Sequence, residues 1–142
     1  MLRKILMVFT AVFLLSVTGP VLAADSLNFN KDGYEQALSQ AAKEKKIVML
    51  YFWADWCGFC KKIEAEVFAD SEVRKVFDEA FLAVSIDINK DPQKLSEKFR
   101  ASALPTLTFL NAQGEMLGYW EGATDPKTFI EILKYVQRTT QS

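Results

Sequence analysis

Two stretches of the chain are apolar at almost every position and are too short to be long helices. They cover residues 47–53 and 81–87. Runs of this length and continuity are typical of strands that are buried on both faces of a sheet. Residues 106–110 and 115–120 predict two more strands, and residues 111–114 between them predict a hairpin turn. We therefore expect a sheet whose central strands are covered on both sides.

Between these strands, apolar residues recur at the spacing of amphipathic helices. The predicted helices run from residue 34 to about 42, 58 to 67, 71 to 77, 92 to about 99, and 126 to 136. Asp70 or Ser71 is expected to cap the third helix, while Asp91 and Asp125, each before a proline, are expected to cap the last two. The order combines parallel crossovers with one antiparallel hairpin. It predicts an α/β fold with a central mixed sheet of about four to five strands and helices on both faces.

The N-terminus has the three-part plan of a secretory signal peptide. Arg3 and Lys4 precede an apolar stretch, and small residues allow cleavage after Ala23 or Ala24. The alternative is an uncleaved membrane anchor, but the apolar stretch is shorter than the roughly 20 residues that span a bilayer. We therefore expect a signal peptide over residues 1–23 and a single domain over residues 24–142 that works in an exported compartment, where disulfides persist.

Charge gives no indication of a polyanionic partner. The chain has 17 basic and 18 acidic residues, for a net charge of −1, and loss of Arg3 and Lys4 makes the mature protein more acidic. Nucleic-acid binding and binding to an anionic membrane surface are therefore not expected. The domain is long enough to form a core without disulfide staples, so its two cysteines are free for chemistry.

The only cysteines are Cys57 and Cys60, directly after the predicted strand 47–53. At the start of a helix, this spacing places both sulfurs on one side, close enough to bridge. Unpaired helix amides stabilise negative charge, so Cys57 is the expected nucleophile and Cys60 the resolving thiol. A fixed staple would stabilise poorly because the loop is so short. A zinc site needs four ligands, and the chain has no histidine and no third cysteine, so no metal is expected.

The chain resembles the thioredoxin family over essentially all of its mature length. The resemblance rests on residues 52–60 (FWADWCGFC), on residues 104–106 (LPT) before a strand, and on glycines in the hairpin and before the last helix. It implies a thioredoxin fold and a cis bond between Leu104 and Pro105 opposite the cysteines. It also implies a groove for an extended substrate segment, formed by Trp56, Gly58, Phe59, Leu104 and Pro105.

Three positions depart from the family pattern. Tyr51 stands where a buried aspartate is usual, and Ser85 replaces the lysine usually paired with it. The usual proton acceptor for Cys60 is therefore missing, and Glu64 or Asp55 is expected to substitute, although either also fits an exposed charge. Ala65 replaces a proline that commonly kinks the active-site helix, so we expect a straighter helix.

Two local patterns suggest different subgroups. Phe59 between the cysteines resembles some exported isomerases. Residues 53–57 and 67–71 resemble the periplasmic reducing domain of a transmembrane thiol-disulfide interchange reductant, and this match covers more residues. The resemblance implies a periplasmic protein-disulfide reductase without a cofactor, fed by a membrane electron donor.

Other readings of the site remain open. They are an oxidase or isomerase using the same cysteines, and a peptide-binding chaperone module in which the cysteines are incidental. The expected partners are exported proteins that carry disulfides or dithiols. Because the chain has no spare sequence for a dimerisation domain, we expect a monomer.

Overall fold

The structure is a computed structural model that describes residues 26–30 and 33–140. Its centre is a four-stranded sheet in the order β2-β1-β3-β4. The strands are β1 (Ile47–Trp53), β2 (Phe81–Asp87), β3 (Thr106–Leu110) and β4 (Met116–Glu121). β1 pairs in parallel with β2, and β3 runs antiparallel to both β1 and β4. The mixed sheet has the predicted crossover and the predicted hairpin.

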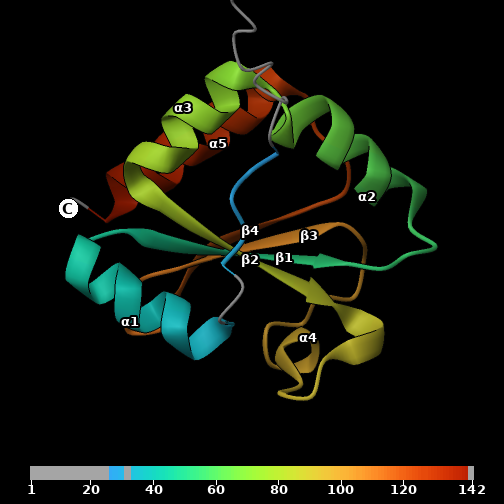
Figure 1. Ribbon diagram of the computed structural model, residues 1–142, viewed down its shortest axis with the longest axis horizontal. Helices are drawn as coiled ribbons and strands as arrows, with labels where there is room; N and C mark the ends of the chain where they lie inside the picture. The colour runs from blue at the N-terminus through green and yellow to red at the C-terminus, as the bar shows by residue number, and fades with distance from the viewer. Residues whose placement is uncertain (1–25, 31–32, 141–142) are drawn as a thin grey trace, which may run out of the picture.

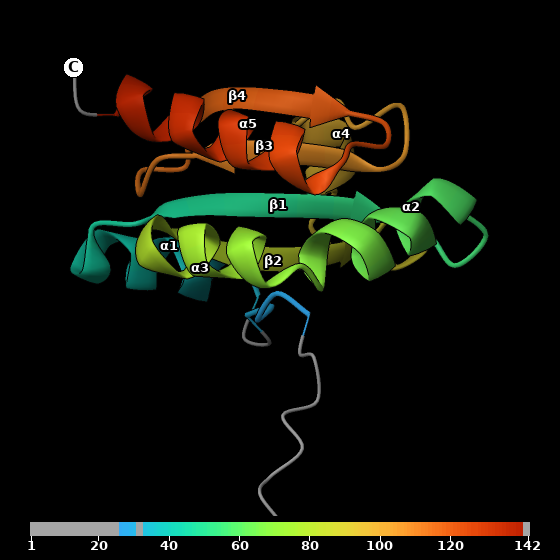
Figure 2. The same cartoon turned by 90° about the horizontal axis from the view of Figure 1, so that it is seen from above.

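Helices cover both faces of the sheet, as predicted (Figure 1). One face is covered by α1 (Tyr34–Glu44) and α4 (Leu95–Lys98). The other is covered by α2 (Gly58–Ile63), α3 (Ser71–Ala80) and α5 (Pro126–Thr139). Figure 2 shows α2 at the end of β1 and α3 and α5 lying along the strands. We call these the α1/α4 face and the α2/α3/α5 face.

The sheet divides the core into two clusters because successive side chains of a strand point to opposite faces. Phe52 and Leu95 belong to the cluster on the α1/α4 face. The other cluster contains both cysteines and a chain of aromatic contacts, in which Phe68 packs against Tyr51 and Phe129 with ring centroids 5.1 and 5.9 Å apart. The cysteines are therefore part of the core on only one face.

A short N-terminal segment adds to the α2/α3/α5 face. Leu27 is buried, and Phe29 forms an isolated parallel bridge with Ala83 of β2. The amide of Asn30 donates a 2.7 Å hydrogen bond to the Ala83 carbonyl. The Phe29 ring lies 5.8 Å from that of Tyr51. This segment thus encloses the tyrosine from the β2 side.

Two sequence predictions were wrong in detail. The helix predicted from residue 92 begins only at Leu95, because Lys94 before it takes a left-handed conformation with φ 53°. The Asp91 carboxylate spans the intervening turn and accepts hydrogen bonds from the amides of Leu95 and Ser96, at 2.9 and 2.7 Å. The last strand begins at Met116 and ends at Glu121, one residue later than predicted.

The active-site helix is not a regular α-helix over its whole length, and the straighter course expected from Ala65 stays a prediction. After α2 the chain continues as a π-helical segment, Glu64–Phe68, and α3 then begins after Asp70. The Asp70 carboxylate caps α3 by accepting the amides of Glu72 and Val73 at 3.0 Å. A π-helical turn inserts an extra residue into the hydrogen-bond ladder, so the α-helical register ends at Ile63 without a proline.

The predicted signal peptide, residues 1–23, lies outside the described residues, so it and the domain boundary at residue 24 stay predictions. Within the part of the chain that the structure describes, no helix combines the length and apolar character needed to cross a membrane.

Candidate active site

The two cysteines lie at the N-terminal end of α2, shortly after the end of β1. A turn closed by a 3.1 Å hydrogen bond from the Cys57 amide to the Ala54 carbonyl reverses the chain. Cys57 is the N-cap of α2, with extended backbone, and its sulfur accepts the amide of Cys60 at 3.1 Å. A sulfur at this position is close to the unpaired amides at the start of the helix. The local fold therefore favours negative charge on Cys57 when the pair is reduced.

Cys57 and Cys60 are joined by a disulfide, with their Cα atoms 5.3 Å apart. The spacing of the sequence had predicted that the two sulfurs are close enough to bridge. Both residues are largely buried, Cys57 at 5% exposed and Cys60 at 1%. Cys60 lies in the first turn of α2 and packs in the core, while Cys57 lies at the N-terminal end of the helix.

Large apolar side chains surround the disulfide at the surface. Trp56 is 67% exposed and Phe59 is 63% exposed, and Gly58 between the cysteines is also exposed. Exposed aromatics next to a buried disulfide are unusual for packing and typical of a contact surface. Trp53, by contrast, is partly buried against the core, and its indole N–H donates a 2.7 Å hydrogen bond to the Ser85 hydroxyl.

The segment before β3 reaches the same end of the sheet. The Leu104–Pro105 peptide bond is cis. Thr106, the next residue, pairs with Phe52 near the end of β1, the strand that leads to Cys57. The Pro105 carbonyl is occupied by the amide of Gly122 at 2.8 Å. The structure thus brings the predicted groove segment to the strand end that precedes the cysteines.

A buried tyrosine links the sheet to the helix that carries the cysteines. The Tyr51 hydroxyl donates to Glu64 Oε1 at 2.8 Å and lies 3.4 Å from the Cys60 carbonyl oxygen. Burial raises the pKa of Tyr51 strongly, and the hydrogen bond to Glu64 and its negative charge raise it further. Tyr51 is therefore a neutral donor at physiological pH.

This contact was only half visible in the sequence. Tyr51 stands where the family has an aspartate, and the sequence predicts Glu64 as a substitute acceptor. No local pattern in the sequence predicts the bond between them. Asp55, the other predicted acceptor, is exposed on the turn before Cys57. Ser85 occupies the lysine position and is engaged by Trp53 rather than by Tyr51.

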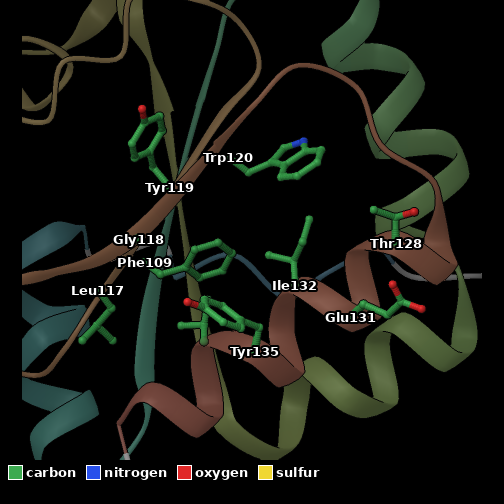
Figure 3. Close-up of a pocket in the computed structure, with 10 residues that line it drawn as sticks. Phe109, Leu117, Gly118, Tyr119, Trp120, Thr128, Glu131, Ile132 and Tyr135 are labelled. Atoms are coloured by element: carbon green, nitrogen blue, oxygen red, sulfur yellow. The ribbon is translucent and has the colours of Figure 1, made fainter.

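An apolar hollow lies elsewhere on the surface. It measures about 340 Å³ and lies between β4 and α5, where Phe109, Trp120 and Ile132 point toward one another (Figure 3). None of the residues predicted for the redox site lines it. Among the described residues, no group of three or more potential ligand side chains is placed to hold a metal ion.

A mixed sheet with helices on both faces, and a Cys-x-x-Cys disulfide at the start of the helix after the first strand, define a thioredoxin-fold protein of the thiol-disulfide oxidoreductase class. Residues 34–137 match the family model described as a thioredoxin-like domain. The chain therefore belongs to the thioredoxin-like family.

Named relatives agree with this assignment. The chain is 34% identical over 119 residues to the thiol:disulfide interchange protein DsbD of Photorhabdus laumondii, a match that covers 80% of this chain and 21% of the relative. It thus spans about a fifth of that longer protein.

Two solved structures are similar in both sequence and fold. A putative disulphide-isomerase from Bacteroides thetaiotaomicron is 33% identical with a TM-score of 0.69, covering 84% of this chain and 98% of the other. The reduced C-terminal domain of Neisseria meningitidis DsbD is 28% identical with a TM-score of 0.60, covering 71% and 91%. The resemblance to the interchange reductants is thus confirmed at the level of the domain.

Proposed function

We propose that this protein is an exported thiol-disulfide oxidoreductase that reduces disulfides of partner proteins by cycling Cys57 and Cys60 between dithiol and disulfide. The observation that carries the proposal is the unequal setting of the two sulfurs. Cys57 caps the helix and accepts an amide hydrogen bond, whereas Cys60 is enclosed in the core. The Cys57 sulfur is thus placed to attack a partner disulfide, and the Cys60 sulfur to resolve the mixed disulfide.

The cycle has two exchange steps. The Cys57 thiolate attacks one sulfur of a partner disulfide, so a Cys57–partner bond forms and the other partner sulfur leaves as a thiolate. Cys60 then loses its proton and attacks Cys57, which closes the Cys57–Cys60 bond and expels the second partner thiolate. The partner gains two electrons and the cysteine pair loses two. A separate donor must then reduce the Cys57–Cys60 disulfide.

The partner is expected to bind as an extended segment beside the disulfide. Trp56 and Phe59 provide exposed apolar surface, and Gly58 between the cysteines leaves room for close approach. On the other side of the groove, the backbone of Leu104 is available for strand-like pairing, while Pro105 has no amide hydrogen to offer. This shape favours a protein substrate over a small molecule.

Proton transfer to and from Cys60 is assigned first to Glu64. It lies one helical turn beyond Cys60, on the same side of the helix, and is hydrogen-bonded to Tyr51 beneath the site. Asp55 is the second candidate because its exposed carboxylate lies on the turn before Cys57. A positioned carboxylate can act as a general base toward the resolving thiol.

The relatives and the N-terminus support a direction of electron flow and a location. Similarity to interchange proteins named DsbD supports a reductant fed by a membrane electron donor. The predicted signal peptide over residues 1–23 supports a periplasmic location, with a monomeric domain from residue 24. The partners would then be exported proteins that contain disulfides or dithiols.

A covalent trap tests the proposal. Cys60→Ser keeps the nucleophile and removes the resolving thiol, so partner proteins should accumulate as mixed disulfides on Cys57. The matched control is Cys57→Ser, which keeps one thiol but places it in the core. Complexes that run apart in non-reducing gels and collapse on reduction are expected for Cys60→Ser alone. Equal trapping by both variants, or none by either, would contradict the proposed roles.

A further inference from the structure

The Tyr51 hydroxyl contacts two residues of the helical stretch after β1: the backbone of Cys60 and the carboxylate of Glu64, which is assigned to proton transfer. We propose that Tyr51 is a positioning residue for the resolving step, whose hydroxyl holds the Glu64 carboxylate beside the turn that carries Cys60. The inference rests on the proposed exchange function and adds to it a residue that acts through the Glu64 side chain.

The geometry gives the hydroxyl one strong partner. A phenol has a single proton to donate. The 2.8 Å contact to Glu64 Oε1 is much shorter than the 3.4 Å contact to the Cys60 carbonyl oxygen, so the proton is directed to Glu64. The Tyr51 hydroxyl oxygen therefore lies near the backbone of Cys60 while its proton is bonded to the Glu64 carboxylate. No rearrangement of the strand is needed to keep both groups together.

The tyrosine is rigid where the glutamate is not. Tyr51 is 1% exposed, and its ring is enclosed by Phe29 and Phe68 at centroid distances of 5.8 and 5.1 Å. Glu64 is only partly buried and begins the π-helical segment. A glutamate side chain loses substantial rotamer freedom when it is fixed, so a rigid donor with a charge-assisted hydrogen bond is the natural means of fixing it.

The surroundings of the hydroxyl offer few other charges. Glu64 is the only charged group that acts on Tyr51 among the residues the structure describes, and it raises the tyrosine pKa rather than lowering it. From α5, Phe129 packs behind Phe68, and on β2 the facing residue is Ser85, which Trp53 engages. Tyr51 therefore remains a donor and does not itself take the proton from Cys60.

In the resolving step, the proton of Cys60 passes to the carboxylate, and the thiolate formed attacks Cys57. The Tyr51 O–H bond stays intact throughout. Removing the hydroxyl leaves Glu64 present but free to rotate into solvent. Only the second exchange step should then slow, because the attack by Cys57 does not use this proton.

The two steps can be separated with the aryl disulfide dithiobis-nitrobenzoate, used on the reduced full-length protein in a stopped-flow instrument. Attack by Cys57 releases one coloured thiolate, and resolution by Cys60 releases the second. We expect Tyr51→Phe to slow the second phase by about tenfold, the loss expected for one hydrogen bond to a charged group. Its pH dependence should move to higher pH, while the first phase is unchanged.

The matched control is Tyr34→Phe. Tyr34 is another buried tyrosine, on the α1/α4 face, and its hydroxyl contacts Lys98 Nζ at 3.3 Å. This variant should behave as wild type in both phases. If Tyr51→Phe also matches wild type, or slows both phases equally, Tyr51 does not act on the resolving step and the proposal is overturned.

A double variant tests whether Tyr51 acts through Glu64. Glu64→Gln alone should slow the second phase at least as much, and Tyr51→Phe added to it should slow the phase no further. Additive effects would overturn the proposal. Failure of the exchange function itself is distinguishable, because the wild-type protein would then not release two coloured thiolates.

Discussion

The two faces of the sheet are built from similar apolar residues but differ in what their buried polar groups touch. On the α1/α4 face, the hydroxyl of Tyr34 meets the ammonium of Lys98, which also lies 5.1 Å from the centres of the Tyr34 and Phe99 rings. On the α2/α3/α5 face, the hydroxyl of Tyr51 meets the Glu64 carboxylate and lies 3.4 Å from the Cys60 carbonyl oxygen. The same residue type thus closes a packing contact on one face and contacts the backbone of the predicted resolving cysteine on the other.

The Tyr34–Lys98 and Tyr51–Glu64 contacts differ in the chemistry that they allow. A cation over two rings is a stabilising contact. A neutral phenol against a carboxylate, one helical turn from a thiol, is an arrangement suited to moving a proton. Variants that affect one face and not the other therefore separate stability from reactivity.

The largest contrast should come from the nucleophile. Cys57→Ala removes the thiolate that opens the partner disulfide, so reduction of insulin by this protein should fall to the rate of the dithiothreitol control. The far-face variant Tyr34→Phe should keep its activity, as measured by insulin turbidity under the same conditions. Substantial reduction by Cys57→Ala would mean that Cys60 attacks partners directly.

A second pair of variants compares the cores of the two faces. Phe68 and Phe52 are both fully buried, on the α2/α3/α5 and α1/α4 faces respectively. Truncation to alanine should lower the free energy of unfolding by about 3–5 kcal/mol in each case, measured by urea denaturation. Only Phe68→Ala should also slow the resolving phase, because Phe68 supports the Tyr51 ring. An equal kinetic effect of Phe52→Ala would show that the faces are not separate.

The smallest expected effect concerns Asp91 on the α1/α4 face. Burial by itself would raise the pKa of Asp91, but hydrogen bonds from Ser96 and Leu95 outweigh it and lower the pKa below the ordinary value of 3.8. A carboxylate whose pKa is depressed in the folded state stabilises the protein at pH values above its pKa in the unfolded chain. This contribution is lost as the pH falls through its pKa in the folded state.

Asp91→Asn keeps one acceptor oxygen but removes the charge and the second acceptor, so it should lower the free energy of unfolding by about 0.5–1 kcal/mol at neutral pH. The difference from wild type should shrink below about pH 4, as urea denaturation at a series of pH values would show. Dithiol exchange should be unaffected. A stability difference that persists in acid would rule out the ionised carboxylate as the cause.

Much of the fold was predictable because its signals are local. The apolar runs predict the bounds of β1 and β2 as the structure has them. Asp125 is a cap as predicted, and of the two candidates Asp70 and Ser71 the structure has Asp70 as the cap of α3. The disulfide was predictable because a spacing of three residues in a helix fixes the geometry of the two sulfurs. Each of these inferences needs only neighbouring residues.

The remaining features depend on contacts between distant elements. The bond between Tyr51 and Glu64 joins a strand to a helix, and it depends on the rotation of that helix about its axis. The π-helical segment that contains Glu64 was not visible in the sequence. The late start of α4 depends on how the Asp91 carboxylate folds the turn onto Ser96. No local pattern encodes these arrangements.

The bridge between Phe29 and Ala83 affects whether copies of the protein can associate through the edges of the sheet. β2 is an outer strand, and an outer strand with free backbone groups is a template for aggregation. The Asn30 amide occupies the Ala83 carbonyl, so the middle of this edge is closed by the chain's own N-terminal segment. β4 is the other edge, and there Met116 and Tyr119 remain exposed. Within the described residues, protection against strand-to-strand association is therefore one-sided.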